Sequence, residues 1–401
     1  MVPRKKLDIG WTDLAFGLLA CLTRRDSAAI AERLELLSSP DGRSLACLSV
    51  RSGFDLVLQE LALPRGSEVL VSAITIRDMV GILEHHGLVA VPVDLEPATC
   101  AVRLEALESA VTPRTRAVLI AHLFGNRTDL DGVVEFAKRQ KLFLIEDCAQ
   151  AFAADGYRGH ADSDVVMFSF GTIKTATAGG GALLGFKTAA LRDAIAARQS
   201  AYPRQSHGIF AKRLARMTAL RVLGGRLPYT LFFFLCRALG RNHDLVIGGA
   251  IRGFPGSDLM RKLRHQPPAA MLALIERRLR NTTPATLAAR IDTATKAMRR
   301  LPSKLQLGTG ATPHSHWVCP IQSTQPDLLV CHLWRHGFDA TRGASSMVAV
   351  NAPAGAPAAR DAQRMIAQIV YLPVECCASD EEIERLAQLV VQFEAAHGQS
   401  M

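Results

Sequence analysis

Short apolar runs alternate with amphipathic segments over the first half of the chain. The runs are rich in Val, Ile and Leu, as buried strands are, and the segments between them repeat apolar residues with a helical period. This alternation predicts an α/β protein whose mostly parallel sheet is covered by helices on both faces. We expect strands at 45–50, 68–74, 89–94, 117–123, 142–145 and 164–170, and helices at 27–37, 55–62, 77–86, 104–111, 130–139 and 189–201.

Two of these strands end in side chains that suit a cofactor. The run at 142–145 leads to Asp147, and the run at 164–170 leads to Lys174 and then to the glycine cluster 179–181. Ligands of such sheets bind at the carboxyl ends of the strands. Pyridoxal phosphate (PLP) needs a carboxylate that keeps its ring nitrogen protonated and a lysine that carries its aldehyde as a Schiff base. We therefore expect Asp147 and Lys174 to hold PLP, with burial lowering the pKa of the lysine.

The surrounding residues strengthen this expectation. The sequence EDCAQA at 146–151, followed by FSFGTIK at 168–174, resembles the signature of the DegT/StrS family of sugar aminotransferases. The resemblance implies a fold-type I PLP-transferase, in which a central sheet flanked by helices is joined to a smaller C-terminal α/β domain. It also implies that Asp147 pairs with the ring nitrogen, Gln150 lies against the ring, Ser169 contacts the phosphate and Lys174 is the Schiff-base lysine.

Two further strand ends match the family near the expected site. Ser52 and Gly53 stand where the family has a Ser-Gly-Thr turn that holds the cofactor phosphate at a helix N-terminus, and Phe54 replaces the threonine. Ile76 stands where the family places an aromatic ring over the cofactor, and an aliphatic side chain stacks less well there. The resemblance thus adds Ser52, Gly53, Phe54 and Ile76 to the cofactor-binding residues.

Other positions depart from the family or leave two roles open. Thr175 replaces the usual asparagine after the lysine, and Gly180 replaces an acidic residue of the glycine cluster. His122 matches a family pattern, but a lone histidine at a strand end has either a structural or a direct role. Arg264 lies in a loop that resembles one reaching the partner's cofactor in family dimers. Arg261, Lys262 or Arg264 meets a phosphate across that interface, or these residues begin a solvated basic helix.

Composition sets outer limits on the protein. The 401 residues are 49% hydrophobic and 21% charged, which predicts a folded chain with ample core. We expect a large PLP-binding domain at 1–200, a basic helical insertion at 201–258 and a small domain at 259–401. The nine cysteines contain no CxxC pair and no zinc-like spacing, so we expect reduced thiols, a cytoplasmic location and no metal.

The positive charge of the chain is concentrated in one region. No Asp or Glu occurs from Ala194 to His243, so the basic residues of this segment are not balanced by acidic ones. The segment therefore contributes much of the net charge of +10 of the whole chain. A helix expected at 208–224 places Phe210, Leu214 and Met217 on one face and its basic residues, Lys212, Arg213 and Arg216, on the other. The run at 227–236 is apolar on every side but too short to cross a bilayer.

Three interpretations of this insertion remain open. It packs as a buried element on the dimer or the large domain, or it docks on an anionic membrane through 208–239, or it contacts nucleic acid. The last is disfavoured because the aromatic residues are bunched rather than interleaved with the basic ones, so we expect no nucleic-acid partner. The membrane interpretation would make the protein peripheral to the inner face of a membrane.

These observations predict a PLP-dependent aminotransferase. By resemblance, the donor is an amino acid such as glutamate, the acceptor carries a keto or aldehyde group on a sugar or lipid-linked molecule, and two chains form a homodimer with shared sites. Lyase or racemase chemistry would use the same motifs, and a non-catalytic, membrane-associated protein would keep the same sheet. The sequence alone leaves both alternatives open.

Overall fold

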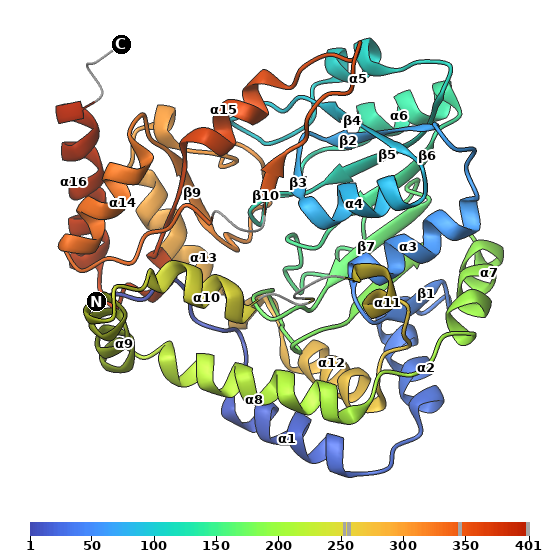
Figure 1. Ribbon diagram of the computed structural model, residues 1–401, viewed down its shortest axis with the longest axis horizontal. Coiled ribbons are helices and arrows are strands. Elements are labelled where there is room, and N and C mark those ends of the chain that lie inside the picture. Colours follow the sequence, from blue (N-terminus) through green and yellow to red (C-terminus); the bar gives the residue numbers. More distant parts are fainter. Residues whose placement is uncertain (252–253, 255–257, 344–346, 398–401) are drawn as a thin grey trace.

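A seven-stranded sheet forms the centre of the structure, a computed structural model that describes residues 1–251, 254, 258–343 and 347–397. The strand order is β1-β8-β7-β6-β5-β2-β4 (Figure 1). Strand β8 runs antiparallel to both of its neighbours, and the remaining neighbouring pairs are parallel. The strands are β1 (Ser44–Cys47), β2 (Glu68–Ser72), β4 (Val89–Val93), β5 (Thr115–Ala121), β6 (Phe143–Asp147), β7 (Val165–Ser169) and β8 (Ala182–Phe186).

Helices cover both faces of this sheet because successive side chains of a strand point to opposite faces. In β2, Val69 and Val71 join the apolar cluster beneath α3, α4 and α7, whereas Leu70 joins the cluster beneath α5 and α6. Helices α1, α2 and α12 cover that second face over β1, β7 and β8. The bounds are α1 (Trp11–Leu22), α2 (Ser27–Ser38), α3 (Val50–Leu61), α4 (Arg77–His85), α5 (Leu104–Ala110), α6 (Asp131–Gln140), α7 (Ala189–Ser200) and α12 (Ala269–Asn281).

A second, smaller apolar cluster lies in the C-terminal part of the chain. Strands β9 (Cys319–Gln322) and β11 (Ile369–Leu372) pair antiparallel and pack with α13, α14 and α16. Strand β10 (Met347–Ala349) instead pairs with β3 (Ile74–Ile76), beside the central sheet. The remaining elements are α11 (Leu259–Leu263), α13 (Pro284–Arg299), α14 (Pro326–Arg335), α15 (Arg360–Gln368), α16 (Asp380–His397) and short 3-10 turns at Ser303–Leu305 and Val374–Cys376. Helix α12 shares its cluster with α1 and α2, so packing groups it with the central sheet. The predicted boundaries, including that at 259, stay predictions.

The insertion consists of three helices, α8 (His207–Leu223), α9 (Arg226–Ala238) and α10 (His243–Ile251). Helix α8 runs beside α1 along the lower edge of Figure 1 and buries Phe210, Leu214 and Met217. Helix α9 is apolar around most of its circumference but packs on one side only. Tyr229, Phe233 and Cys236 are buried, whereas Leu227, Leu231, Phe234, Leu235 and Leu239 are exposed. Within the described residues no single helix has the length and apolarity to cross a membrane. Helices α8 and α9 meet these criteria only as a pair, and a bend of 97° separates them.

The α/β fold predicted from the alternation is confirmed, with one local correction at the first strand. The strand ends at Cys47 and the helix begins at Val50, so Ser52 and Gly53 lie inside the first turns of α3 rather than in a turn before it. The cause is Ser49, whose hydroxyl accepts a hydrogen bond from the backbone N–H of Ser52 at 3.1 Å. A serine that caps in this way begins a helix earlier than the apolar pattern suggests.

Candidate active site

The proposed cofactor residues gather at one edge of the central sheet. Strands β6 and β7 are parallel neighbours, so Asp147 and Ser169 at their ends lie at the same edge. Strand β1 runs in the same direction, because it and β7 are both antiparallel to β8, and it delivers α3 to that edge. Lys174 follows β7 in a turn in which its N–H donates to the carbonyl oxygen of Gly171 at 2.9 Å. The topology therefore brings Asp147, Ser169, Lys174 and the N-terminus of α3 to the same edge of the sheet.

Lys174 is half-buried and has no hydrogen-bond acceptor in the described part of the chain. Its Nζ lies 3.9 Å from the centre of the Trp317 ring. Burial lowers its pKa to about 7, the charge of Asp147 opposes this shift, and the charges of Lys5 and Arg51 add to it. A lysine with such a pKa is substantially neutral near pH 7, and a neutral amine can act as a nucleophile or a base.

Asp147 and Gln150 lie on the strand end opposite this lysine. The Asp147 Oδ1 accepts a hydrogen bond from the backbone N–H of Ala149 at 2.9 Å. Burial raises the pKa of Asp147, against the effects of that hydrogen bond and of the charges of Lys174 and His122. The Gln150 side chain accepts from the N–H of Phe124 at 2.8 Å and directs its amide nitrogen toward the sulfur of Met347, 4.0 Å away. The geometry leaves the Oδ2 atom of Asp147 available to a ligand.

The first turn of α3 places Ser52 and Gly53 at the sheet edge and Phe54 in the core. The Ser52 side chain is buried and lies 3.0 Å from the hydroxyl of Ser49. A Cβ on Gly53 would lie 2.6 Å from Leu184, so close packing against β8 requires glycine there. Phe54 is fully buried among the apolar residues between α3 and the sheet. The Phe54 side chain therefore packs in the core, and Ser52 and Gly53 are the residues of this turn that lie at the sheet edge.

Ile76 and Met347 face each other across the β3–β10 pair. Ile76 ends β3, is half-buried and begins α4. Ser169 is also half-buried, and its hydroxyl accepts from the N–H of Gly171 at 3.4 Å. The roles toward a cofactor stay predictions for Ser52, Gly53, Phe54, Ile76, Gln150 and Ser169.

His122 has a structural role in this arrangement. Its Nδ1 accepts a hydrogen bond from the backbone N–H of Thr128 at 3.2 Å, so its Nε2 carries the proton and donates to Glu146 at 2.9 Å. Glu146 also accepts from Tyr157 at 2.6 Å and from Ser163 at 2.9 Å. Burial would raise the pKa of Glu146, but these donors hold it at about 2. This buried network fixes β6, and with it the position of Asp147.

His122, Glu146 and Cys148 also have the spacing of metal ligands, within 4.8 Å of one another. The Glu146 Oε1 that faces His122 is already occupied by hydrogen bonds from His122, Tyr157 and the Cys148 thiol. The expectation that the protein uses no metal stays a prediction.

Comparison with known proteins matches part of the sequence to a family. Residues 40–219 match the profile of the DegT/DnrJ/EryC1/StrS aminotransferase family. The chain is 34% identical over 132 residues to a GDP-perosamine synthase of Escherichia coli O157:H7, an alignment that covers 32% of this chain and 36% of that protein. The sequence of this part of the chain is thus similar to that of DegT/DnrJ/EryC1/StrS aminotransferases. Its sequence matches span about a third of the length of these curated relatives.

Solved structures agree with this similarity at the level of the fold. The aminotransferase TlmJ from Streptoalloteichus hindustanus superposes with a TM-score of 0.70 at 19% identity, covering 99% of both chains. NtdA from Bacillus subtilis, solved with bound cofactor PMP, superposes with a TM-score of 0.68 at 16% identity, covering 96% of this chain and 82% of NtdA. The fold-type I architecture is thereby confirmed.

The structure explains how this chain accommodates its two departures from the family pattern after Lys174. Thr175 is buried, and its hydroxyl accepts from Arg290 at 3.2 Å. At Gly180, a side chain would collide with the guanidinium of Arg213, which donates to the carbonyl oxygen of Gly179 at 3.3 Å. The prediction that Arg213 lies on the outer face of its helix is therefore wrong. It follows Phe210 by three residues and precedes Leu214, so it borders the buried face.

Trp317 is a site residue that the sequence motifs did not indicate. Its ring lies against Lys174, and its indole N–H donates to the carbonyl oxygen of Ile173 at 2.7 Å. Lys5 donates to the backbone oxygen of Trp317 at 2.5 Å. Both residues are far from the lysine in sequence and match no motif, so only the tertiary contacts identify them.

Arg264 is held within its own chain. Its guanidinium donates to both carboxylate oxygens of the buried Asp55, at 3.0 and 3.1 Å. This pairing favours the structural alternative over contact with a phosphate across a dimer interface.

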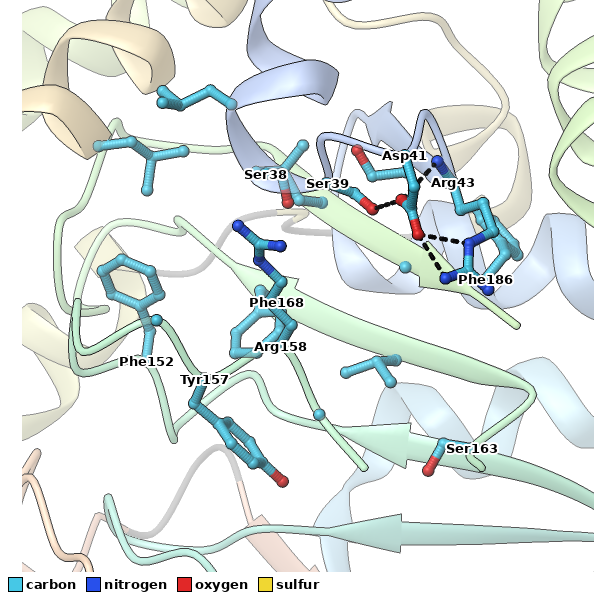
Figure 2. A pocket seen from close by; sticks show the side chains of 18 of the residues that line it. Ser38, Ser39, Asp41, Arg43, Phe152, Tyr157, Arg158, Ser163, Phe168 and Phe186 are labelled. Atoms are coloured by element: carbon cyan, nitrogen blue, oxygen red, sulfur yellow. Dashed lines mark hydrogen bonds and ion pairs between the residues drawn. The ribbon is translucent and has the colours of Figure 1, made fainter. Parts of the chain in front are cut away.

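A surface hollow of about 450 Å³ lies apart from these residues, over β7 and β8. Figure 2 shows the rings of Phe152 and Tyr157 on one side of it and the pair Asp41 and Arg43, joined by dashed lines, on the other. Neither Lys174 nor Asp147 lines it. The hollow is therefore distinct from the candidate active site, which lies at the sheet edge with Lys174 and Asp147.

Proposed function

We propose that the protein is a PLP-dependent aminotransferase that takes the amino group from an amino acid, such as glutamate, and passes it to a keto or aldehyde carbon of a sugar or lipid-linked acceptor. The observation that supports this most is the pairing of Lys174, whose pKa is about 7, with Asp147 at one sheet edge. The match to the family and the PMP bound to NtdA support the choice of cofactor.

The described residues at the site fit PLP. Lys174 has an amine with no hydrogen-bond acceptor, and Asp147 has one oxygen without a hydrogen bond, so each end of the site lacks a partner that the cofactor can provide. When bound, PLP supplies an aldehyde that takes up the amino group and a ring that accepts electrons. Asp147 would hold the ring nitrogen protonated, and Ser52, Gly53 and Ser169 would hold the phosphate.

Lys174 would carry out the proton transfers. Its neutral amine would act as the base that removes a proton from the donor's α-carbon, and the ammonium form so produced would act as the acid that gives the proton back. Trp317 limits the movement of this amine, because its ring lies against the Nζ and is itself held by a hydrogen bond to Ile173. The partial burial of this amine keeps its pKa low.

The decisive experiment follows the visible absorbance of the purified protein before and after addition of glutamate, together with the formation of 2-oxoglutarate. An aminotransferase loses the band of its lysine-bound cofactor and forms one equivalent of the keto acid. Lys174→Ala should show neither change, whereas Lys187→Ala, which removes an ion-paired lysine beyond β8, should behave as wild type. A bound cofactor that produces no keto acid from any amino donor would favour the non-catalytic alternative.

Two chains are expected to form the working unit, because family members share sites across a dimer. This expectation rests on the resemblance alone. Sedimentation equilibrium of the active protein should give twice the chain mass. A monomer with full activity would contradict it.

We also propose that the outer face of α9 contacts an anionic membrane surface. Leu227, Leu231 and Phe234 are 70%, 62% and 59% exposed and share this face, and the exposed Arg237 and Arg241 lie at its end. Apolar side chains flanked by arginines suit insertion among negatively charged headgroups. A cytoplasmic protein with this face would be peripheral to the inner leaflet.

Vesicle sedimentation tests this surface. The protein should co-sediment with vesicles containing phosphatidylglycerol and much less with pure phosphatidylcholine, and the double change Leu231→Ser and Phe234→Ser should abolish binding. If the double variant instead dissociates a dimer and leaves vesicle binding intact, the face is an interface between two copies and the membrane proposal fails.

A further inference from the structure

Two arginine side chains from different elements approach the ring of Phe254. The Cζ of Arg213, from α8, lies 5.9 Å from the centre of the Phe254 ring, and the Cζ of Arg51, from the first turn of α3, lies 4.7 Å from the same centre. Arg213 also reaches the carbonyl oxygen of Gly179. The two guanidinium groups therefore border the edge of the sheet at which Lys174 lies.

This collection of positive charge is incompletely neutralised. Arg51 pairs with Asp78, but Arg213 has no ion pair among the described residues. Burial and the charges of Arg51 and Arg216 lower the pKa of Arg213 to about 10. Bringing like charges together in a partly buried place costs free energy, and a bound anion would offset that cost.

The fold holds Arg213 in this position. Its neighbours on α8, Phe210 and Leu214, are fully buried against α1 and α12, which fixes the helix over the glycine cluster. A Cβ at Gly180 would collide with the Arg213 guanidinium and lie 2.9 Å from the Met271 side chain. The absence of a side chain at Gly180, where the family usually has an acid, is thus the condition that admits this arginine.

We propose that Arg51 and Arg213 form a binding site for a phosphate monoester. A planar guanidinium matches phosphate oxygens with two parallel hydrogen bonds, and two such groups suit a dianion. The phosphate belongs to the cofactor or to a phosphorylated acceptor, so this inference deepens the proposed function and rests on it for the identity of the ligand. If the phosphate belongs to the acceptor, Arg213 is a specificity residue supplied by the insertion.

Calorimetric titration of the cofactor-free, full-length protein with inorganic phosphate tests the site. Arg213→Met should weaken phosphate binding at least tenfold. Arg216→Met, which removes an exposed arginine from the same helix and changes the net charge equally, should weaken it less than twofold. An unchanged thermal unfolding midpoint in Arg213→Met would show that the helix stays in place. Equal losses in the two variants, or no phosphate binding by the wild type, would overturn the proposal.

Repeating the titration after loading with PLP identifies the source of the phosphate. If the Arg213-dependent binding disappears, the site holds the phosphate of the cofactor. If it persists, the site serves a phosphorylated acceptor. Borohydride reduction followed by mass spectrometry reports separately whether Lys174 carries the cofactor. Phosphate binding that depends on Arg213 in a protein whose Lys174 is never labelled would support the anion site while contradicting the aminotransferase.

Discussion

The sheet edge and the insertion use polar and apolar residues in opposite ways. At the edge, the buried Glu146 is satisfied by donors from its own chain, and they fix the strand that carries Asp147. In the insertion, one face of α9 is packed and the other is exposed, and Arg213 is partly buried without an ion pair among the described residues. The edge is internally complete except where a cofactor would bind. The insertion leaves the apolar outer face of α9 exposed.

Adjacent phenylalanines of α9 sharpen this comparison most. Phe233 is 3% exposed and contacts the rings of His243 and Trp334, whereas Phe234 is 59% exposed. Phe233→Ala should lower the free energy of unfolding by about 3–5 kcal/mol, and Phe234→Ala by less than about 0.5 kcal/mol. Urea unfolding of the two variants measures the difference. Similar losses in both would mean that the two sides of α9 are equally packed.

The acid at the sheet edge should affect chemistry more than folding. Asp147→Asn keeps the size of the side chain but removes the negative charge expected at the ring nitrogen, so turnover should fall by at least about a hundredfold. Cofactor attachment to Lys174, measured by borohydride trapping, should persist. If Asp147→Asn keeps full turnover, the carboxylate does not serve the ring nitrogen.

The network around Glu146 should make stability depend on acid pH. Glu146→Gln replaces an acceptor with an amide that cannot satisfy all the donors, and should cost about 1–3 kcal/mol at neutral pH. Because folding lowers the pKa of Glu146 to about 2 from its ordinary 4.5, its contribution is present above pH 4.5 and is lost as the pH falls from there toward 2.

The difference in unfolding free energy between wild type and Glu146→Gln should therefore narrow over that acid range. Denaturant titrations at several pH values measure it. A constant difference would show that the network does not hold the carboxylate ionised.

The smallest expected effect concerns Lys5, whose charge helps to lower the pKa of Lys174. The rate at which cofactor-free protein takes up PLP should rise with pH around a midpoint near 7, because the neutral amine is the reactive form. Lys5→Gln should move this midpoint to higher pH by less than about one unit. Lys6→Gln, which changes an exposed neighbour, should leave it in place. A midpoint near the ordinary value for lysine would contradict the proposed burial.

The sequence by itself determined the sheet and the order of the acid, the lysine and the glycines along it. These features are local, because a short apolar run is enough to predict a strand. Since β6 and β7 are parallel neighbours, Asp147 and Ser169 at their carboxyl ends lie at the same edge of the sheet. Contacts between distant segments were decided only by the tertiary structure. Trp317 bonds to Ile173 across 144 residues, and no local pattern encodes such a contact.

The same limit applies to the helices of the insertion. The periodicity of α8 identified its buried face, and Arg213 borders that face. The Arg213 side chain lies over Gly180, which has no side chain to exclude it, and the sequence does not show that contact. In α9, apolar residues surround the helix, so the sequence could not tell Phe233 from Phe234. Packing against Trp334 made that choice, because burial depends on what a side chain meets in space rather than on its own polarity.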